Sequence, residues 1–246
     1  MRVAAYQGRC TGRLTRAALA QLERAAPDVL VLPEYFLVPP EARSHREAAG
    51  HAEAGLRHVE EVSRRLGAVV AGGSFVERDG SSWYNSSPLF DSGRLLAIQR
   101  KLSPTERELL TAGISPGTET RVVAARGVRF ATLVCADVLE RGRFARLGER
   151  GVDFILVPTL SPLRAGEPLE AKRERDHEIF LEGARAAQAV VVKACGIGSL
   201  FGGRLQGRSL IVAPEGFLAR VPISGEQRPR LLWTDVKRRA PAVAAS

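Results

Sequence analysis

Apolar positions along this chain follow two alternating patterns, short continuous runs and repeats at helical spacing. Val29-Leu30-Val31-Leu32 is a continuous apolar run, which is typical of a strand buried on both faces. The segment 14–25 instead places Leu and Ala residues at helical spacing, and Pro27 marks its end. The two patterns keep alternating toward the C-terminus, which predicts an α/β fold with helical layers covering sheet.

Applied to the whole chain, these patterns predict ten strands and four helices. The predicted strands cover 3–6, 29–32, 68–75, 83–90, 95–99, 128–135, 154–157, 189–194, 210–213 and 218–221, and the predicted helices cover 14–25, 56–66, 143–150 and 169–189. The segment 103–120 is rich in Pro, Gly, Ser and Thr, and a loop of that length in a compact domain is usually functional. We predict one domain over 1–236, followed by a basic tail of small residues at 237–246.

The chain of 246 residues carries a formal net charge of +9, which raises the possibility of a nucleic-acid or membrane partner. The basic residues are scattered, however, and their densest cluster, Lys237-Arg238-Arg239, lies in the predicted tail. No apolar segment approaches the length needed to span a membrane. We therefore expect a solvated basic surface that favours acidic substrates, with neither nucleic acid nor membrane as partner.

Cys10, Cys135 and Cys195 are an odd number of cysteines at wide spacing, which is neither a disulfide framework nor a metal-binding knuckle. The N-terminus enters a strand-like run without a signal-peptide pattern, so we expect a reducing cytoplasm. No His, Asp or Glu cluster has metal-ligand spacing, and we expect no metal or cofactor. Cys10 and Cys195 are interpreted as structural.

Three predicted strands each end in a reactive group, namely Glu34, Lys101 and Cys135. The carboxyl ends of adjacent strands in α/β folds meet in one crevice, so we expect these side chains to converge. Glu34 would take the thiol proton, Cys135 would attack a carbonyl, and Lys101 would stabilise thiolate and oxyanion. The four histidines do not follow buried strands, and a surface role is expected for them.

The residues around these three groups resemble the nitrilase, or carbon–nitrogen hydrolase, superfamily over nearly the whole chain. The segments that carry the resemblance are Val3-Ala4-Ala5-Tyr6-Gln7, Leu30-Val31-Leu32-Pro33-Glu34-Tyr35-Phe36, Tyr84-Asn85-Ser86 with Arg100-Lys101, Leu133-Val134-Cys135-Ala136-Asp137 and Gly207-Arg208-Ser209 with Pro214-Glu215-Gly216. The resemblance implies a four-layer αββα sandwich that commonly pairs with a second copy, hence a homodimer or higher homo-oligomer. It also implies a thioester intermediate on Cys135.

Members of this superfamily usually carry a second glutamate near the catalytic lysine, and the resemblance assigns that role here to Glu106, with Glu108 in reserve. The oxyanion hole would combine Lys101 with the backbone N–H of Ala136. Tyr35 and Ala136 are the expected substrate-binding residues. The chain departs from the family pattern at Ala136, where an aromatic residue is common, and at Cys195, where asparagine is frequent.

The function expected from these residues is hydrolysis of a non-peptide carbon–nitrogen bond in a small linear amide or carbamoyl amide. The expected partner is this small amide-like molecule. Two alternatives use the same triad, an acyltransferase and a nitrilase. A third is a non-enzymatic, basic protein that binds nucleic acid.

Overall fold

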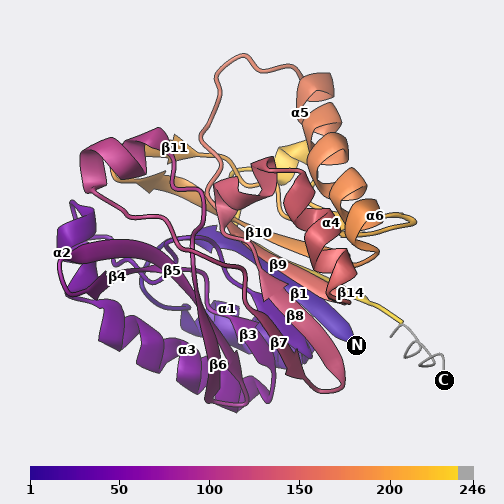
Figure 1. Cartoon of the computed structure of the whole chain (residues 1–246), viewed down its shortest axis with the longest axis horizontal. Helices are drawn as coiled ribbons and strands as arrows, with labels where there is room; N and C mark the ends of the chain where they lie inside the picture. Colours follow the sequence, from indigo (N-terminus) through magenta and orange to yellow (C-terminus); the bar gives the residue numbers. More distant parts are fainter. Residues whose placement is uncertain (238–246) are drawn as a thin grey trace.

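Two β-sheets face each other in the protein, a computed structural model of which describes residues 1–237 (Figure 1). The first sheet contains β1 (Arg2–Arg9), β2 (Val29–Val31), β3 (Val69–Ala71), β4 (Phe75–Asp79), β5 (Ser82–Asp91), β6 (Arg94–Arg100) and β14 (Arg230–Asp235). The second contains β7 (Val122–Ala125), β8 (Val128–Thr132), β9 (Phe154–Thr159), β10 (Val190–Leu200), β11 (Gly203–Leu205), β12 (Leu210–Ala213) and β13 (Gly216–Arg220). Residues 238–246 of the predicted tail lie outside the described residues.

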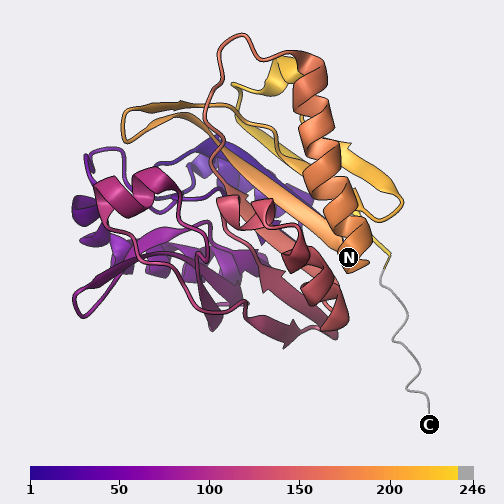
Figure 2. The ribbon, with the colours of Figure 1, turned by 45° about the horizontal axis from the view of Figure 1, so that its top comes forward.

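Helices cover the outer face of each sheet, on opposite sides of the molecule (Figures 1 and 2). The helices are α1 (Arg16–Ala25), α2 (His45–Ala49), α3 (Ala52–Leu66), α4 (Gly142–Glu149), α5 (Leu169–Asp176) and α6 (Glu182–Ala187), with short turns η1 (Glu108–Ala112), η2 (Cys135–Leu139), η3 (His177–Leu181) and η4 (Ile223–Gly225). α1 and α3 pack on the first sheet, whereas α4, η3 and α6 pack on the second. The predicted αββα sandwich is confirmed.

Strands buried on both faces build this arrangement. In β2, Val29 and Val31 point into the core between the sheets, whereas Leu30 points to the layer formed with α1 and α3. In the second sheet Phe130 likewise faces the inter-sheet core, and Ala131 faces the layer with α4 and α6. Because side chains alternate between faces along a strand, each continuous apolar run serves two cores at once.

The two sheets are joined at one end. β1 and β10 run parallel and pair through only two residue pairs, Gly8 with Gly196 and Arg9 with Ile197. At this end β2, β6, β8 and β9 also terminate, since all of them run in the same direction as β1 or β10. The end of the sandwich where the sheets meet is therefore lined by the carboxyl ends of strands from both sheets.

Some element boundaries differ from the predicted ones. The predicted strand 68–75 is divided at Gly72-Gly73 into β3 and β4, because Gly73 has φ +73° and passes against the carbonyl of Pro33. The predicted helix 169–189 is interrupted by the wider turn η3. β14, which pairs with β1, was not predicted. Among residues 1–237, no helix is long and apolar enough to cross a membrane.

Candidate active site

A cavity of about 410 Å³ opens at the end where the two sheets meet. Glu34, Lys101 and Cys135 all line it. Glu34 follows β2 by three residues, Lys101 follows β6 directly, and Cys135 follows β8 by three residues. The structure therefore brings the three predicted groups together.

The way they meet differs from the expectation of adjacent strands. β2 and β6 belong to the first sheet and are separated there by β3 and β5, whereas β8 belongs to the second sheet. The carboxylate and the amine approach the thiol across the gap between the sheets. Joining the sheets at this end is what makes the approach possible.

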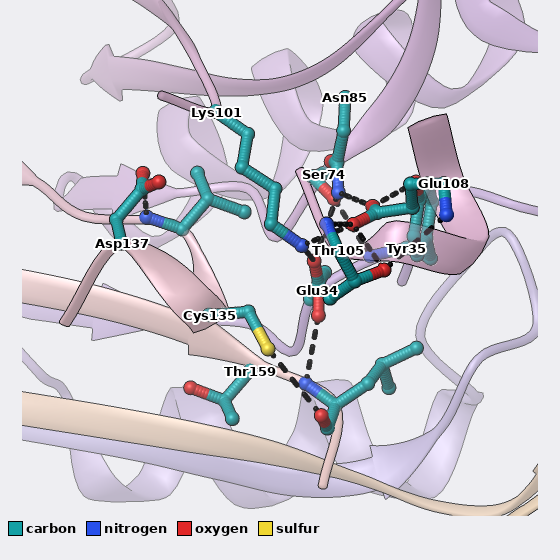
Figure 3. Close-up of polar contacts among 12 residues, drawn as sticks. Glu34, Tyr35, Ser74, Asn85, Lys101, Thr105, Glu108, Cys135, Asp137 and Thr159 are labelled. Atoms are coloured by element: carbon teal, nitrogen blue, oxygen red, sulfur yellow. Dashed lines mark hydrogen bonds and ion pairs between the residues drawn. The ribbon is translucent and has the colours of Figure 1, made fainter. Parts of the chain in front are cut away.

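Lys101 is the centre of the polar network (Figure 3). Its ammonium donates to Glu34 Oε1 at 2.8 Å and to Glu108 Oε2 at 2.7 Å. The Lys101 side chain is 1% exposed, Glu34 2% and Glu108 6%. The buried ammonium therefore has a charged partner on each of two sides, which is the condition for burying such a charge.

Glu34 and Cys135 are joined through the backbone of Leu160, which follows β9. The Leu160 N–H donates to Glu34 Oε2 at 2.9 Å, and the Cys135 thiol donates to the Leu160 carbonyl at 3.4 Å. The Glu34 carboxylate and the Cys135 thiol also influence each other's pKa. Cys135 itself stays partly exposed toward the cavity, so a carbonyl carbon can reach its sulfur.

The backbone around Cys135 is strained and held in place by Asp137. Cys135 has φ +48°, a left-handed conformation that is unusual for a residue with a side chain. The fully buried Asp137 carboxylate accepts from the N–H groups of Val134, Leu102 and Ser103 at 2.9, 2.9 and 2.7 Å. One side chain thus ties the turn that carries the thiol to the loop that follows Lys101.

The choice of the second glutamate is corrected by the structure. Glu106 is exposed, whereas Glu108 is buried against Lys101. Thr105 and Glu108 form reciprocal bonds, since each side chain accepts from the other's backbone N–H. This is a capping box, in which Ser or Thr is followed three residues later by Glu. The Thr105-Glu106-Arg107-Glu108 sequence carried that signal, and it favours Glu108.

Asn85 is a member of the network that sequence reasoning did not single out. Its amide nitrogen donates to Glu34 Oε1 at 2.8 Å and to Glu108 Oε1 at 2.9 Å. The predicted substrate-binding residue Tyr35 donates its hydroxyl to Glu108 Oε1 at 2.6 Å, and both Tyr35 and Ala136 line the cavity. Every described oxygen of the two glutamates therefore has at least one donor, so their positions are fixed before any ligand arrives.

Burial and charge shift the pKa values of these groups in different directions. Burial raises the pKa of Glu34, and the charge of Glu108 adds to this against the opposing effect of Lys101. Burial also tends to raise the pKa of Glu108, but the Lys101 charge and hydrogen bonds outweigh it and lower the value to about 2. The two carboxylates therefore differ. Glu34 accepts a proton more readily than an ordinary glutamate, whereas Glu108 stays ionised.

The thiol and the amine are shifted as well. Burial, followed by the charge of Glu34, raises the pKa of Cys135 well above its ordinary value. Burial lowers the pKa of Lys101, but the surrounding negative charges, led by Glu34, outweigh it and raise the pKa overall. The resting site therefore holds a neutral thiol beside a carboxylate and a permanent cation, which is the arrangement for acyl transfer by nucleophilic attack.

One histidine departs from the expected surface role. His45 lines the cavity, stacks on Phe201 at 4.1 Å between ring centroids and contacts the Tyr35 ring edge-on. Burial lowers its pKa to about 4, so it is a neutral wall residue. Cys10 and Cys195 are buried free thiols. In the part of the chain that is described, no group of three His, Cys, Asp or Glu residues is placed to hold a metal ion.

Comparison with known proteins places the chain beside carbon–nitrogen hydrolases. The sequence profile described as carbon-nitrogen hydrolase matches residues 5–238. Nitrilase 3 from an unknown prokaryotic organism is 31% identical over 185 residues, which are 68% of this chain and 54% of that protein. The chloroplastic omega-amidase of Arabidopsis thaliana is 25% identical, over 68% of this chain and 50% of its own length. The chain spans about half the length of these curated relatives.

Solved structures are similar over a larger share of the chain. The NitN amidase from Nesterenkonia sp. AN1 superposes with a TM-score of 0.80 at 21% identity, covering 96% of this chain and 93% of that one. A mutant of the amidase from that organism, in complex with butyramide, superposes with a TM-score of 0.77 at 21% identity, covering 96% and 90%. At such identities the likeness is one of fold.

Proposed function

The chain belongs to the carbon–nitrogen hydrolase family, and from that premise we propose that it hydrolyses a small linear amide through a thioester on Cys135. The observation that carries the proposal is the Lys101 ammonium bonded to two buried carboxylates, one of which is linked to the thiol through the backbone of Leu160. That geometry supplies a base, a nucleophile and a fixed positive charge at one point of one cavity. The comparisons with amidases support the same class of reaction.

In the proposed first half-reaction, the Cys135 sulfur bonds to the amide carbonyl carbon while its proton passes to Glu34. Negative charge moves to the carbonyl oxygen, where the Lys101 ammonium and the Ala136 N–H stabilise it. Glu34 then returns the proton to the departing nitrogen. The carbon–nitrogen bond breaks, ammonia or an amine leaves, and an acyl thioester remains on Cys135.

In the second half-reaction, Glu34 takes a proton from a water molecule, and the resulting hydroxide attacks the thioester carbon. The tetrahedral species is stabilised by the same two donors. When it collapses, the carbon–sulfur bond breaks and the acid product leaves. Glu34 returns its proton to the sulfur, so each group ends in its starting state.

The chemistry is tested by replacing Cys135 with alanine and measuring ammonia release from a panel of amides, carbamoyl amino acids and nitriles. We expect turnover by the native protein with an acyl adduct on Cys135 detectable by mass spectrometry after acid quench. Cys135→Ala should fold normally, by circular dichroism, and release no ammonia. Cys195→Ala, which removes a buried thiol outside the proposed mechanism, should retain turnover. Activity retained in Cys135→Ala would refute the mechanism.

A further inference from the structure

The cavity that holds Cys135 continues into a second group of polar side chains, which the proposed mechanism does not use. Lys193, Arg208, Asp176 and Gln206 line this part, and we call them the basic subsite. Lys193 lies on β10 and pairs with Asp176, the last residue of α5. A lysine in the middle of the run Val190-Val191-Val192-Lys193-Ala194-Cys195 occupies a position otherwise reserved for core residues.

Lys193 is buried with incomplete hydrogen bonding. Its side chain is 2% exposed, and its ammonium donates to Asp176 Oδ1 at 3.3 Å. The same nitrogen lies 4.4 Å from the centre of the Phe180 ring. An ammonium has three N–H donors, and within residues 1–237 Asp176 is the one hydrogen-bond acceptor found for it. Burying such a charge is costly unless further acceptors are supplied.

Arg208 and Gln206 also have buried polar atoms without hydrogen-bond partners in the described part of the chain. Arg208 is 8% exposed and donates one N–H to the Lys172 carbonyl at 3.1 Å, with Asp176 Oδ2 at 3.8 Å. In the described part of the chain its Nε has no acceptor, and the side-chain oxygen of Gln206, a residue 1% exposed, has no donor. Two buried cations thus share one carboxylate, which leaves the subsite with a net positive charge and free donors.

We propose that the basic subsite binds a carboxylate at the end of the substrate remote from the scissile amide. A carboxylate offers two oxygens to the unused N–H groups of Lys193 and Arg208, and such charge-assisted bonds are the strong ones in a water-poor cavity. This inference rests on the proposed amide hydrolysis and names its substrate class. The preferred substrates are monoamides of dicarboxylic acids and other linear amides with an anionic end.

The distribution of charge along the cavity also sets the direction in which such a substrate enters. The end near Cys135 holds Glu34 and Glu108, which repel a carboxylate and leave room for a neutral amide. The opposite part holds Lys193 and Arg208, with Arg204 also in the wall, whereas the wall residues Arg164 and Arg175 are paired with Glu167. An anionic amide therefore binds with its amide at the sulfur and its charge at the basic subsite.

The test compares pairs of substrates that differ only in the remote charge. Monoamides of dicarboxylic acids of increasing length are each assayed against the neutral primary amide of the same carbon number. For the native protein we expect kcat/KM to favour the anionic member of the best-fitting pair. In Lys193→Met this preference ratio should fall by about 10- to 100-fold, the usual effect of losing a hydrogen bond to a charged group. Arg173→Met, which removes an exposed cation of α5, should leave the ratio unchanged.

Lys193→Gln, which keeps a donor for Asp176, serves where the methionine variant does not fold. The matching dicarboxylate product, titrated calorimetrically into Cys135→Ala, should bind and should lose affinity when Lys193 is also changed. Equal kcat/KM for both members of every pair in the native protein overturns the inference while leaving amide hydrolysis standing. If no amide is turned over, the proposed hydrolysis is refuted instead. The dicarboxylate titration then tests the basic subsite on its own.

Discussion

Replacing Glu108 by glutamine changes the charge of the site without changing its size. The substitution removes one of the two negative charges that contact Lys101. Because the charge of Glu108 raises the pKa of Glu34, the pKa of Glu34 should fall in Glu108→Gln. In the proposed mechanism Glu34 must be deprotonated to accept the thiol proton, so activity should be lost as pH falls through this pKa. The acid limb of kcat/KM should therefore move to lower pH.

The geometry gives the size of this shift. Glu34 Oε1 and Glu108 Oε2 lie 2.8 and 2.7 Å from the same ammonium nitrogen, and the sum of these distances, about 5.5 Å, is their largest possible separation. Two unit charges about 5.5 Å apart repel by about 3 kcal/mol at an effective dielectric constant of about 20. That energy corresponds to about two pKa units. Since the glutamine oxygen keeps a partial negative charge, we expect a shift of about one to two units.

The assay is kcat/KM for ammonia release followed across the acid limb in the native protein, Glu108→Gln and Glu106→Gln. Glu106 is two residues away and exposed, so its variant is a matched control and should follow the native profile. The plateau of Glu108→Gln should also fall by about 100-fold, because Lys101, the proposed oxyanion donor, loses a fixed partner. Where turnover is too slow to measure, the rate at which chloroacetamide alkylates Cys135, followed by mass spectrometry, gives the same acid limb of the pH profile. An unmoved acid limb, or one displaced to higher pH, would show that the charge of Glu108 does not control Glu34.

Two further substitutions test the supports of the site. Gly73→Ala places a Cβ 2.1 Å from the Pro33 carbonyl oxygen at φ +73°, so it should lower the free energy of unfolding by about 3 kcal/mol or more in urea titrations. The control Gly80→Ala, at φ +59° with open space around it, should lower it by only about 1 kcal/mol. Equal losses in the two variants would contradict the close-contact argument. Tyr35→Phe removes a hydrogen bond that lowers the pKa of Glu108. A carboxyl group whose pKa is lower in the folded than in the unfolded protein stabilises the fold at pH values above its unfolded pKa and loses that effect as pH falls. The pH midpoint of acid unfolding should therefore be higher in Tyr35→Phe than in the native protein. A midpoint that stays the same or falls counts against a role of Tyr35 in holding Glu108 ionised.

The pattern of apolar residues along the chain predicted where most of the buried strands lie. Continuous apolar runs identified β2, β8, β9 and β10, because a strand between two cores has no polar face. The positions of Glu34, Lys101 and Cys135 just after strands followed from the same runs. Their meeting across two sheets did not follow, because sheet membership depends on pairing between distant segments. β14 was missed for a related reason, since Arg230–Asp235 holds a short apolar run between polar ends, stays only partly buried, and becomes a strand through its pairing with the distant β1.

The sequence carried a local signal for Glu108 as the second glutamate, the capping pattern with Thr105, but the prediction chose Glu106. The family resemblance was used to choose Glu106, but in a helical turn two residues of separation point to opposite faces. The capping interaction of Thr105 with Glu108 fixes which face carries the buried carboxylate. Lys193 is similar, because a single charged residue inside an apolar strand already indicated a buried partner. Its neighbours Asp176 and Arg208 come from other elements and required the three-dimensional structure.

The raised pKa values of Cys135 and Glu34 have one cause, and together they make the proposed proton transfer feasible. Losing the thiol proton to solvent would add a negative charge to a buried site that already holds Glu34 and Glu108, both paired with the cation Lys101. Passing the proton to Glu34 leaves the total charge unchanged, so burial penalises both sides of the transfer alike. The thiol therefore remains protonated until a carbonyl carbon accepts the sulfur, and the negative charge then moves onto an oxygen beside Lys101. A site that held a free thiolate at rest would need a second cation in place of Glu108, and the structure has the opposite arrangement.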